Sequence, residues 1–428
     1  MIRKWWSGAC GVASAVAILG TLPASAQALT PPDWQRQLGS TADELALSVS
    51  SVGDAVYVAG HTGGQLGSTP SSGGQDVFVA KYGVDGALAW VRQVGTAMND
   101  RALSVTADLA GNVYVAGYTW GSFLPFVNAG GTDFFVLKLD ATGALAWVQQ
   151  FGTETDDFAT GIAVTRRAGQ DGLFISGYSL GRIDGTPSPG NYDVVVAKFD
   201  TGGNPYWMRQ FGSGRSDVAL GVAVGPSEDV YVSGYTMGSL DGVTLPGTTV
   251  DLFLAKYDVL GAAQWVRQLG SASDEYGTGV AVDEDGAAYV SGYTFGALDG
   301  NVRVGTYDAV LVKYDAAGGR KWTRQLGTTT TDYAQGVAVD AGGAVHLVGH
   351  TSGALDGNVS LGGGDVFLST FDTAGNRLGT RQVGSSAADR GQAVAVGVDG
   401  AAYAVGYTWG SLPGSTSAGG YDAILFRF

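Results

Sequence analysis

The chain has 428 residues, 70 of them glycine, and its 39 acidic residues against 24 basic ones leave a formal net charge of −15. Its hydrophobic fraction of 45% and aromatic fraction of 11% are higher than disordered chains contain, so we expect a packed core. The negative charge disfavours nucleic acid and anionic membranes as partners, because both attract basic surfaces.

Residues 1–26 have the three regions of a secretory signal peptide. Arg3 and Lys4 precede an apolar stretch, and small residues at 24–26 form a cleavage site. Cys10, the only cysteine, lies in this segment, so the mature protein would contain no disulfide. No later apolar run reaches the roughly 20 residues that a membrane helix needs. We therefore expect an exported protein that is periplasmic, on the cell surface or extracellular, with no membrane insertion.

Residues 27–428 repeat one unit of about 57 residues seven times, which predicts a single domain built from repeats. In chain order, a unit contains a short run such as 221–224 (GVAV), a phrase such as 231–236 (YVSGYT), an apolar run opened by Asp such as 251–257, and a W-x-R-Q phrase such as 265–268. These runs are rich in Val, Tyr, Phe and Trp and are bounded by Gly, Asp and Asn, as strands are. They predict an all-β fold, a seven-bladed β-propeller with four antiparallel strands per blade.

The order of the runs predicts how the ring closes. The mature chain begins with a W-x-R-Q phrase, which is the fourth run of a unit, and it ends with a third run. The last blade is therefore one strand short. We expect the N-terminal strand 33–38 to complete it by pairing with the C-terminal strand 421–428.

A constant spacing predicts ion pairs within the blades. In five units the Asp that opens the third run and the Arg of the W-x-R-Q phrase are separated by the same number of residues. Folding the two strands onto each other would bring these side chains together, and a sixth pair would form across the chain ends. The predicted pairs are Asp76–Arg92, Asp193–Arg209, Asp251–Arg267, Asp308–Arg324, Asp365–Arg381 and Arg36–Asp422.

The repeat resembles the bacterial SBBP repeat, a seven-bladed propeller family, through phrases such as residues 283–294 (DEDGAAYVSGYT) and 265–270 (WVRQLG). The resemblance covers residues 33–428. It implies an exported propeller of mostly unassigned role, and it supplies no catalytic motif.

Repeated acids raise the question of metal binding. An acid precedes the first run of every unit, and an Asp opens every third run, so both sets are expected on the loop-rich face of the ring. Calcium, which takes oxygen ligands, is one interpretation. We favour the other, that Asp suits tight turns and pairs with Arg, and we predict no metal site and no cofactor, with calcium as the alternative. The two sets are Glu44, Asp100, Asp157, Asp217, Glu275, Asp332 and Asp389, and Asp76, Asp133, Asp193, Asp251, Asp308, Asp365 and Asp422.

Four more Asp lie in Leu/Ile-Asp-Gly turns, and three histidines replace tyrosines of other units. The turns lack the dense alternation of acids found in dedicated calcium loops. The histidines are too isolated for a zinc centre or a catalytic triad, and we interpret them as tolerated substitutions. These residues are Asp184, Asp241, Asp299 and Asp356, and His61, His346 and His350.

The position that follows the last Thr or Ser of the second run varies most among the units. Aromatic side chains at such a position indicate a binding surface. Packing beneath the neighbouring loops is the alternative, and we favour it. The candidate ligand-binding residues are Trp120, Phe295 and Trp409, together with Phe123 and Phe126.

We therefore expect a monomeric, exported, non-enzymatic scaffold that presents its acidic, loop-rich face to a protein or a glycan. The first alternative is a carbohydrate-binding module that uses the exposed aromatic residues. A second is a metal-assisted hydrolase or lyase on the acidic face, for which the sequence shows no catalytic constellation.

Overall fold

The computed structural model describes residues 32–428 except 167–171, 184, 186–189, 241 and 243–249. The predicted signal peptide, residues 1–26 with Cys10, lies outside the described residues. Within the described part, no helix is long and apolar enough to cross a membrane. The one helical element there is a short 3-10 turn, η1 (Leu355–Gly357).

The strands form seven four-stranded sheets, or blades, numbered here from the blade that begins with β2. In each blade the strands run antiparallel from the centre of the ring to its rim. The first strands, at the centre, are β2 (Glu44–Val52), β6 (Asp100–Ala107), β10 (Asp157–Val164), β14 (Asp217–Val224), β18 (Glu275–Val282), β22 (Asp332–Val339) and β26 (Asp389–Val396). The second strands are β3 (Ala55–Thr62), β7 (Val113–Thr119), β11 (Leu173–Ser179), β15 (Val230–Thr236), β19 (Ala288–Thr294), β23 (Val345–Thr351) and β27 (Ala402–Thr408).

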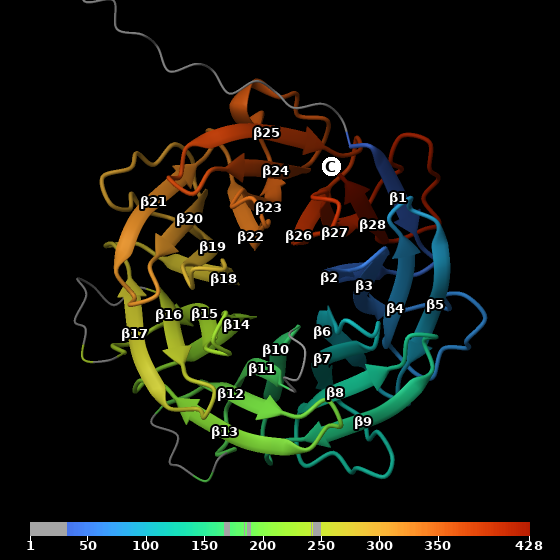
Figure 1. Ribbon diagram of the computed structural model, residues 1–428. Helices are drawn as coiled ribbons and strands as arrows, with labels where there is room; N and C mark the ends of the chain where they lie inside the picture. The colour runs from blue at the N-terminus through green and yellow to red at the C-terminus, as the bar shows by residue number, and fades with distance from the viewer. Residues whose placement is uncertain (1–31, 167–171, 184, 186–189, 241, 243–249) are drawn as a thin grey trace, which may run out of the picture.

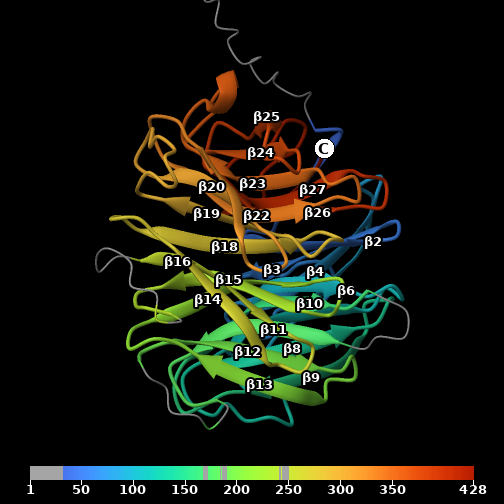
Figure 2. The same ribbon diagram turned by 60° about the vertical axis from the view of Figure 1, so that its left-hand side comes forward.

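The remaining two strands of each blade lie farther from the centre (Figure 1). The third strands are β4 (Asp76–Gly83), β8 (Asp133–Leu139), β12 (Asp193–Phe199), β16 (Asp251–Tyr257), β20 (Asp308–Tyr314), β24 (Asp365–Phe371) and β28 (Asp422–Arg427). The outer strands are β5 (Leu88–Val94), β9 (Leu145–Phe151), β13 (Pro205–Phe211), β17 (Ala263–Leu269), β21 (Arg320–Leu326), β25 (Arg377–Val383) and β1 (Trp34–Leu38). Figure 2 shows the same blades more from the side, with the molecule turned by 60° about the vertical axis. The predicted seven-bladed, all-β propeller is confirmed.

The two ends of the described chain meet in blade 7, whose strand order is β1-β28-β27-β26. Strand β1 pairs antiparallel with β28, and Trp34 lies opposite Arg427 while Leu38 lies opposite Ala423. The backbone N–H of Asp33 also donates to the Arg427 carbonyl at 2.8 Å. The predicted closure by strands 33–38 and 421–428 is therefore confirmed, and the ring has no unpaired sheet edge at this seam.

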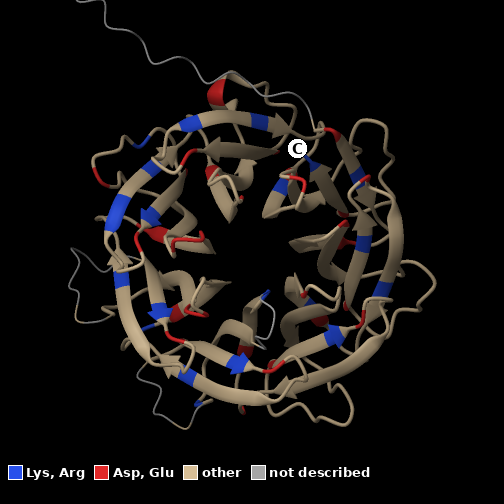
Figure 3. Ribbon diagram, in the orientation of Figure 1, with Lys and Arg blue, Asp and Glu red and all other residues tan. Residues whose placement is uncertain are grey.

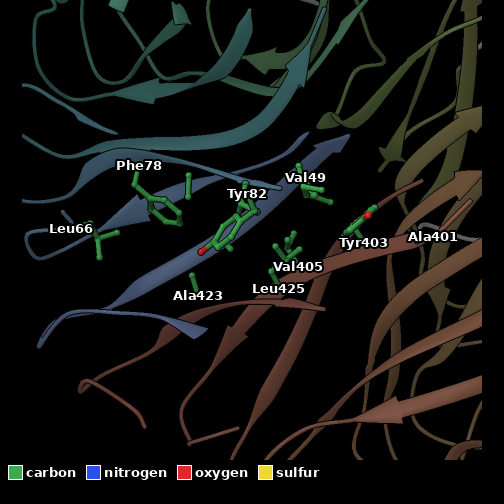
Figure 4. Close-up of a cluster of buried hydrophobic side chains, with 13 residues drawn as sticks. Val49, Leu66, Phe78, Tyr82, Ala401, Tyr403, Val405, Ala423 and Leu425 are labelled. Atoms are coloured by element: carbon green, nitrogen blue, oxygen red, sulfur yellow. The ribbon is translucent and has the colours of Figure 1, made fainter. Parts of the chain in front are cut away.

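The hydrophobic core is divided among the interfaces between blades. Each of seven clusters of buried side chains in the described part draws residues from two adjacent blades. In the cluster of Figure 4, Phe78 and Tyr82 of blade 1 pack with Tyr403 and Leu425 of blade 7. No blade contains a core of its own, so the apolar area buried between neighbours stabilises the ring.

A glycine in every second strand allows the first strand to bend toward it. A Cβ at Gly60 would overlap the carbonyl oxygen of Leu45, and the register of β2 against β3 shifts between Ala46 and Ser48. The other six blades repeat both features. These glycines permit the close backbone approach that the bulge of each first strand requires.

Candidate functional site

The predicted Asp–Arg ion pairs do not form. In blade 1, Val77 lies opposite Val94, so Asp76 shares a face of the sheet with Gln93, while Arg92 lies on the other face. Side chains alternate between faces along a strand, and a partner one residue away is therefore out of reach. The same register separates each predicted pair: Asp76–Arg92, Asp193–Arg209, Asp251–Arg267, Asp308–Arg324, Asp365–Arg381 and Arg36–Asp422.

Glutamine is the partner of the third-strand Asp instead. Gln93 Nε2 donates to Asp76 Oδ2 at 2.8 Å and to the Gly64 carbonyl at 2.9 Å, and its Oε1 accepts from the Leu66 N–H at 3.0 Å. The Asp carboxylate also accepts from the Ser72 N–H at 2.8 Å. This arrangement, the Asp–Gln clasp, fixes the loop between the second and third strands. The seven clasps are Asp76–Gln93, Asp133–Gln150, Asp193–Gln210, Asp251–Gln268, Asp308–Gln325, Asp365–Gln382 and Asp422–Gln37.

The outer-strand arginines connect neighbouring blades at the rim. Arg92 stacks on Trp90, with Cζ 5.4 Å from the ring centroid. Its Nε donates to the Gly143 carbonyl and its Nη2 to the Thr142 carbonyl, both at 3.1 Å. These carbonyls belong to the turn between the third and outer strands of blade 2, a type of turn that we call a rim turn. Basic residues accordingly mark the outer strands in Figure 3.

Both sets of repeated acids are buried at the blade interfaces, so the predicted acidic face is not formed by them. Every first-strand acid is 0% exposed, and no third-strand Asp exceeds 5%. Asp100, for example, accepts hydrogen bonds from the Thr119 hydroxyl and from the Thr96 N–H, the latter at 2.6 Å. The carboxylates satisfy loop and strand donors, and they are not available to an external ligand.

In blades 1 to 6 the third-strand Asp lies beside the first-strand acid of the next blade. A Cβ at Gly95 would overlap Asp76 Oδ1 and would lie 3.1 Å from Asp100 Oδ2. Asp76 Oδ1 is buried without a hydrogen-bond partner. Burial, with Asp76 as a weaker like-charged neighbour, raises the pKa of Asp100. Burial is also the main cause of the raised pKa of the equivalent acids Asp157, Asp217, Glu275, Asp332 and Asp389.

The histidines are buried, as expected of residues that replace strand tyrosines. Burial, and secondarily the charge of Arg101, lowers the pKa of His61 to about 4. Burial also lowers the pKa of His350 to about 3. Both rings are therefore neutral at pH 7. Among the described residues, no group of three or more His, Cys, Asp or Glu could hold a metal ion.

Two of the four Leu/Ile-Asp-Gly turns lie within the described residues, and their acids have protein partners. Asp299 pairs with Arg320 at 2.7 Å and accepts from the Thr323 hydroxyl. Asp356 pairs with Arg377 at 2.7 Å and accepts from the Thr380 hydroxyl. The turns at Asp184 and Asp241 lie outside the described residues.

A series of aromatic rings follows one face of the propeller, where the second strands end and the first strands begin. Most of these rings are half-buried, and neighbouring centroids are about 5–6 Å apart, as in Tyr293–Tyr333 at 4.9 Å. The series runs from blade 2 to blade 7 in three groups of contacting rings, one in blades 2 and 3, one in blades 4 to 6 and one in blade 7, and we call it the aromatic belt. Its members are Tyr118, Trp120, Phe158, Tyr178, Tyr192, Tyr235, Tyr276, Tyr293, Phe295, Tyr307, Tyr333, Tyr407, Trp409 and Tyr421.

Three of the five candidate ligand-binding residues are exposed on the belt: Trp120 at 37%, Phe295 at 36% and Trp409 at 55%. Arg101 lies over the Trp120 ring at 5.6 Å and Arg303 over the Phe295 ring at 4.3 Å.

The assignment of Phe123 as a candidate ligand-binding residue is wrong. It is only 6% exposed and packs on Phe135 in the core between blades 1 and 2, with ring centroids 5.4 Å apart. Phe126 is half-buried in the same loop. The favoured interpretation of packing beneath the loops therefore applies to Phe123.

Sequence reasoning missed most of the belt. The second residue of the first strand contributes Phe158, Tyr276 and Tyr333, and the residue before the third-strand Asp contributes Tyr192, Tyr307 and Tyr421. Neither position is aromatic in all units. Their alignment on one face becomes visible only when strand order and register are known.

Two segments of the chain, residues 89–123 and 264–297, match the SBBP beta-propeller repeat. The chain is 25% identical to an uncharacterized WD repeat-containing protein, L264, of Acanthamoeba polyphaga mimivirus, over 65% of this chain and 26% of that protein. It is 27% identical to the regulatory protein FlaEY of Caulobacter vibrioides, over 57% of this chain and 27% of that protein. The chain thus spans about a quarter of the length of these curated relatives.

Among solved structures, the chain is similar to the WD40 domain of Neurospora crassa Pan2. The TM-score is 0.51 at 9% sequence identity, and the match covers 94% of this chain and 97% of that one. At this identity the likeness shows the propeller fold alone.

Proposed function

We propose that this chain is an exported, monomeric, non-enzymatic propeller of the SBBP repeat type that binds a protein partner through the aromatic belt. The observation that carries the proposal is the gathering of partly exposed rings on one face, in three groups of contacting rings. Aromatic side chains provide large contact areas with little loss of side-chain entropy, and they dominate the energetics of protein interfaces.

The belt replaces the acidic face as the proposed contact surface. The repeated acids are buried in the clasps and at the blade interfaces, whereas Trp120 and Trp409 extend into solvent with more than a third of their surface. The similarity in sequence to a WD repeat-containing protein supports a scaffold role. We assign no catalytic residue, because the acids that a hydrolase or lyase would use already accept internal hydrogen bonds.

A glycan ligand is the second candidate, and the exposure of Trp120 and Trp409 favours it. The apolar faces of sugar rings pack against indole rings in the same manner as other apolar surfaces do. In this case the belt remains the binding surface, and only the chemical class of the ligand changes.

The test compares wild type with the double variant Trp120→Ala/Trp409→Ala. Val398→Ala is the matched control, because Val398 is 76% exposed in a turn between first and second strands, on the opposite face. Each protein is presented to a glycan array and, with a crosslinker, to exported proteins of the source organism.

We expect the double variant to lose bound species that the wild type and the control retain. Loss confined to the array identifies a glycan ligand, and loss confined to crosslinked proteins identifies a protein partner. Equal binding by wild type and the double variant would contradict the role of the belt.

A further inference from the structure

The rim contact of the outer-strand arginines is repeated around the ring with one exception. In five copies, Nε donates to the carbonyl of the glycine in the rim turn of the next blade. In four of these, Nη2 donates to the carbonyl of the residue before that glycine. One edge of the guanidinium is thus filled by two oxygens from consecutive residues. The five are Arg36, Arg92, Arg209, Arg267 and Arg324.

Arg381 is the exception. It belongs to blade 6 and faces blade 7, where the third strand β28 and the outer strand β1 come from opposite ends of the chain, so no rim turn joins them. Its Nε and Nη1 atoms are buried and have no hydrogen-bond partner among the residues that the structure describes. The guanidinium stacks on Phe428, with Cζ 5.3 Å from the ring centroid. Nε therefore lacks the rim-turn oxygen, and Nη1 the oxygen of the preceding carbonyl, that these atoms contact in the other copies.

A second difference opens space beside Arg381. The Trp that precedes each of the five arginines by two positions is Gly379 here, opposite Thr370 in the register. Arg381 therefore lacks the indole on which Arg92 stacks. Asp33, whose charge also acts on Arg381, forms its ion pair with Arg427.

A cavity of about 550 Å³ lies at the interface of blades 6 and 7, beside Arg381. We call it the seam cavity. Its walls are largely apolar, with Trp34, Leu361, Val383 and Pro413 among them, and Arg381 supplies the charge. The groove at the interface of blades 1 and 2 is built from the same four-residue phrase, residues 92–95, and measures about 420 Å³. In that groove the guanidinium is already occupied by the rim turn.

We propose that the seam cavity binds a small organic carboxylate with an apolar body, held by Arg381. Two carboxylate oxygens reproduce the pair of carbonyl oxygens that the other arginines contact, and a carboxylate also neutralises the charge. The apolar body packs against Trp34, Leu361 and Val383, where its removal from water favours binding. This site is separate from the aromatic belt, and its assignment depends only on Arg381 and the seam cavity.

The experiment uses the full exported chain and measures binding of 4-phenylbutyrate by calorimetry. Two comparison probes are 4-phenylbutan-1-ol, which keeps the apolar body without the charge, and inorganic phosphate, which keeps only the charge. The variants are Arg381→Gln and the matched control Arg92→Gln, which removes an arginine of the same phrase at an occupied groove.

We expect 4-phenylbutyrate to bind the wild type and Arg92→Gln with equal affinity, and Arg381→Gln at least tenfold more weakly. The alcohol and phosphate should each bind the wild type at least tenfold more weakly than phenylbutyrate. Melting temperatures report on folding: Arg381→Gln should melt no lower than wild type without ligand, because it removes unpartnered donors, whereas Arg92→Gln should melt several degrees lower.

Three outcomes would overturn the proposal. The first is no binding of phenylbutyrate to the wild type at millimolar concentration. The second is equal affinity in wild type and Arg381→Gln. The third is equal affinity for phenylbutyrate and the alcohol, which would show an apolar cavity without a role for the guanidinium.

Discussion

Gln37 and Asp422, 385 positions apart in the chain, form the hydrogen bond that completes the seventh clasp, with Gln37 Nε2 2.6 Å from Asp422 Oδ2. Gln37 Oε1 also accepts from the Leu412 N–H at 3.1 Å, and Nε2 donates to the Gly410 carbonyl at 2.9 Å. One side chain near the start of the propeller thus holds a loop and a buried carboxylate near its end.

Replacing Gln37 should therefore weaken closure. We expect Gln37→Ala to lower the free energy of unfolding by about 1–3 kcal/mol, because Asp422 and the Leu412 N–H lose a buried partner. Gln35→Ala, which removes an exposed hydrogen bond to Pro413, is the control and should change stability by less than about 0.5 kcal/mol. Chemical denaturation measures both values. Similar small losses in the two variants would contradict the importance of the clasp.

Removing the closing strand should expose the edge of β28. Deletion of residues 27–40 takes away β1, and the unpaired edge would then recruit other chains. We expect aggregation by size-exclusion chromatography and a lower melting temperature. A shorter deletion, 27–31, keeps β1 and should leave a monomer. A soluble monomer of unchanged melting temperature after the longer deletion would argue against closure by β1.

Trp265 tests the rim contacts. Its half-buried ring lies against Tyr231, with centroids 6.0 Å apart, and beneath Arg267, whose Cζ is 5.1 Å from the ring centroid. A Cβ at Gly318 in the next rim turn would lie 2.9 Å from the indole. We expect Trp265→Ala to cost roughly 2–3 kcal/mol in urea denaturation, below the range for fully buried aromatic residues. Leu260→Ala, at a site that is 75% exposed, should cost little; a similar effect of both changes would place the indole outside the interface.

Because the carboxylates of Asp76 and Asp100 are buried side by side, replacing one of them with an amide should raise the stability of the protein by an amount that depends on pH. Asp76→Asn places an N–H₂ donor near Asp100 Oδ2, where the unpartnered Asp76 Oδ1 now lies. We expect this variant to be more stable than wild type by about 1 kcal/mol at pH 7.

The sign of the pH dependence follows from the raised pKa of Asp100. The stability that its bound proton contributes to the wild type is fully present below the ordinary carboxyl pKa and is lost as pH rises through the folded-state value. The advantage of Asp76→Asn should therefore shrink on acidification, as melting curves between pH 4 and 7 would record. A constant difference, or a destabilised variant at pH 7, would contradict the carboxylate pairing.

The repeated strands made the fold and its closure predictable, whereas the partner of the third-strand Asp was not. Counting residues placed Arg92 opposite Asp76, but a shift of one residue in an antiparallel pair moves a side chain to the other face, and Gln93 occupies the face of Asp76. Likewise, an acid that recurs in every repeat of the sequence suggests an exposed ring of negative charge. Only the packing of adjacent blades shows that Asp100 is enclosed.

The rim turn of any blade is an alternative place for the two ends of the chain. A circularly permuted chain, with its present ends joined by a short linker and new ends placed in the rim turn at residues 315–319, should fold into the same ring, since each interface contributes a core of similar kind. The linker would supply carbonyl oxygens opposite Arg381, while Arg267 would lose those of Gly318 and Ala317. Permutation would thus transfer the unpaired guanidinium from one interface to another.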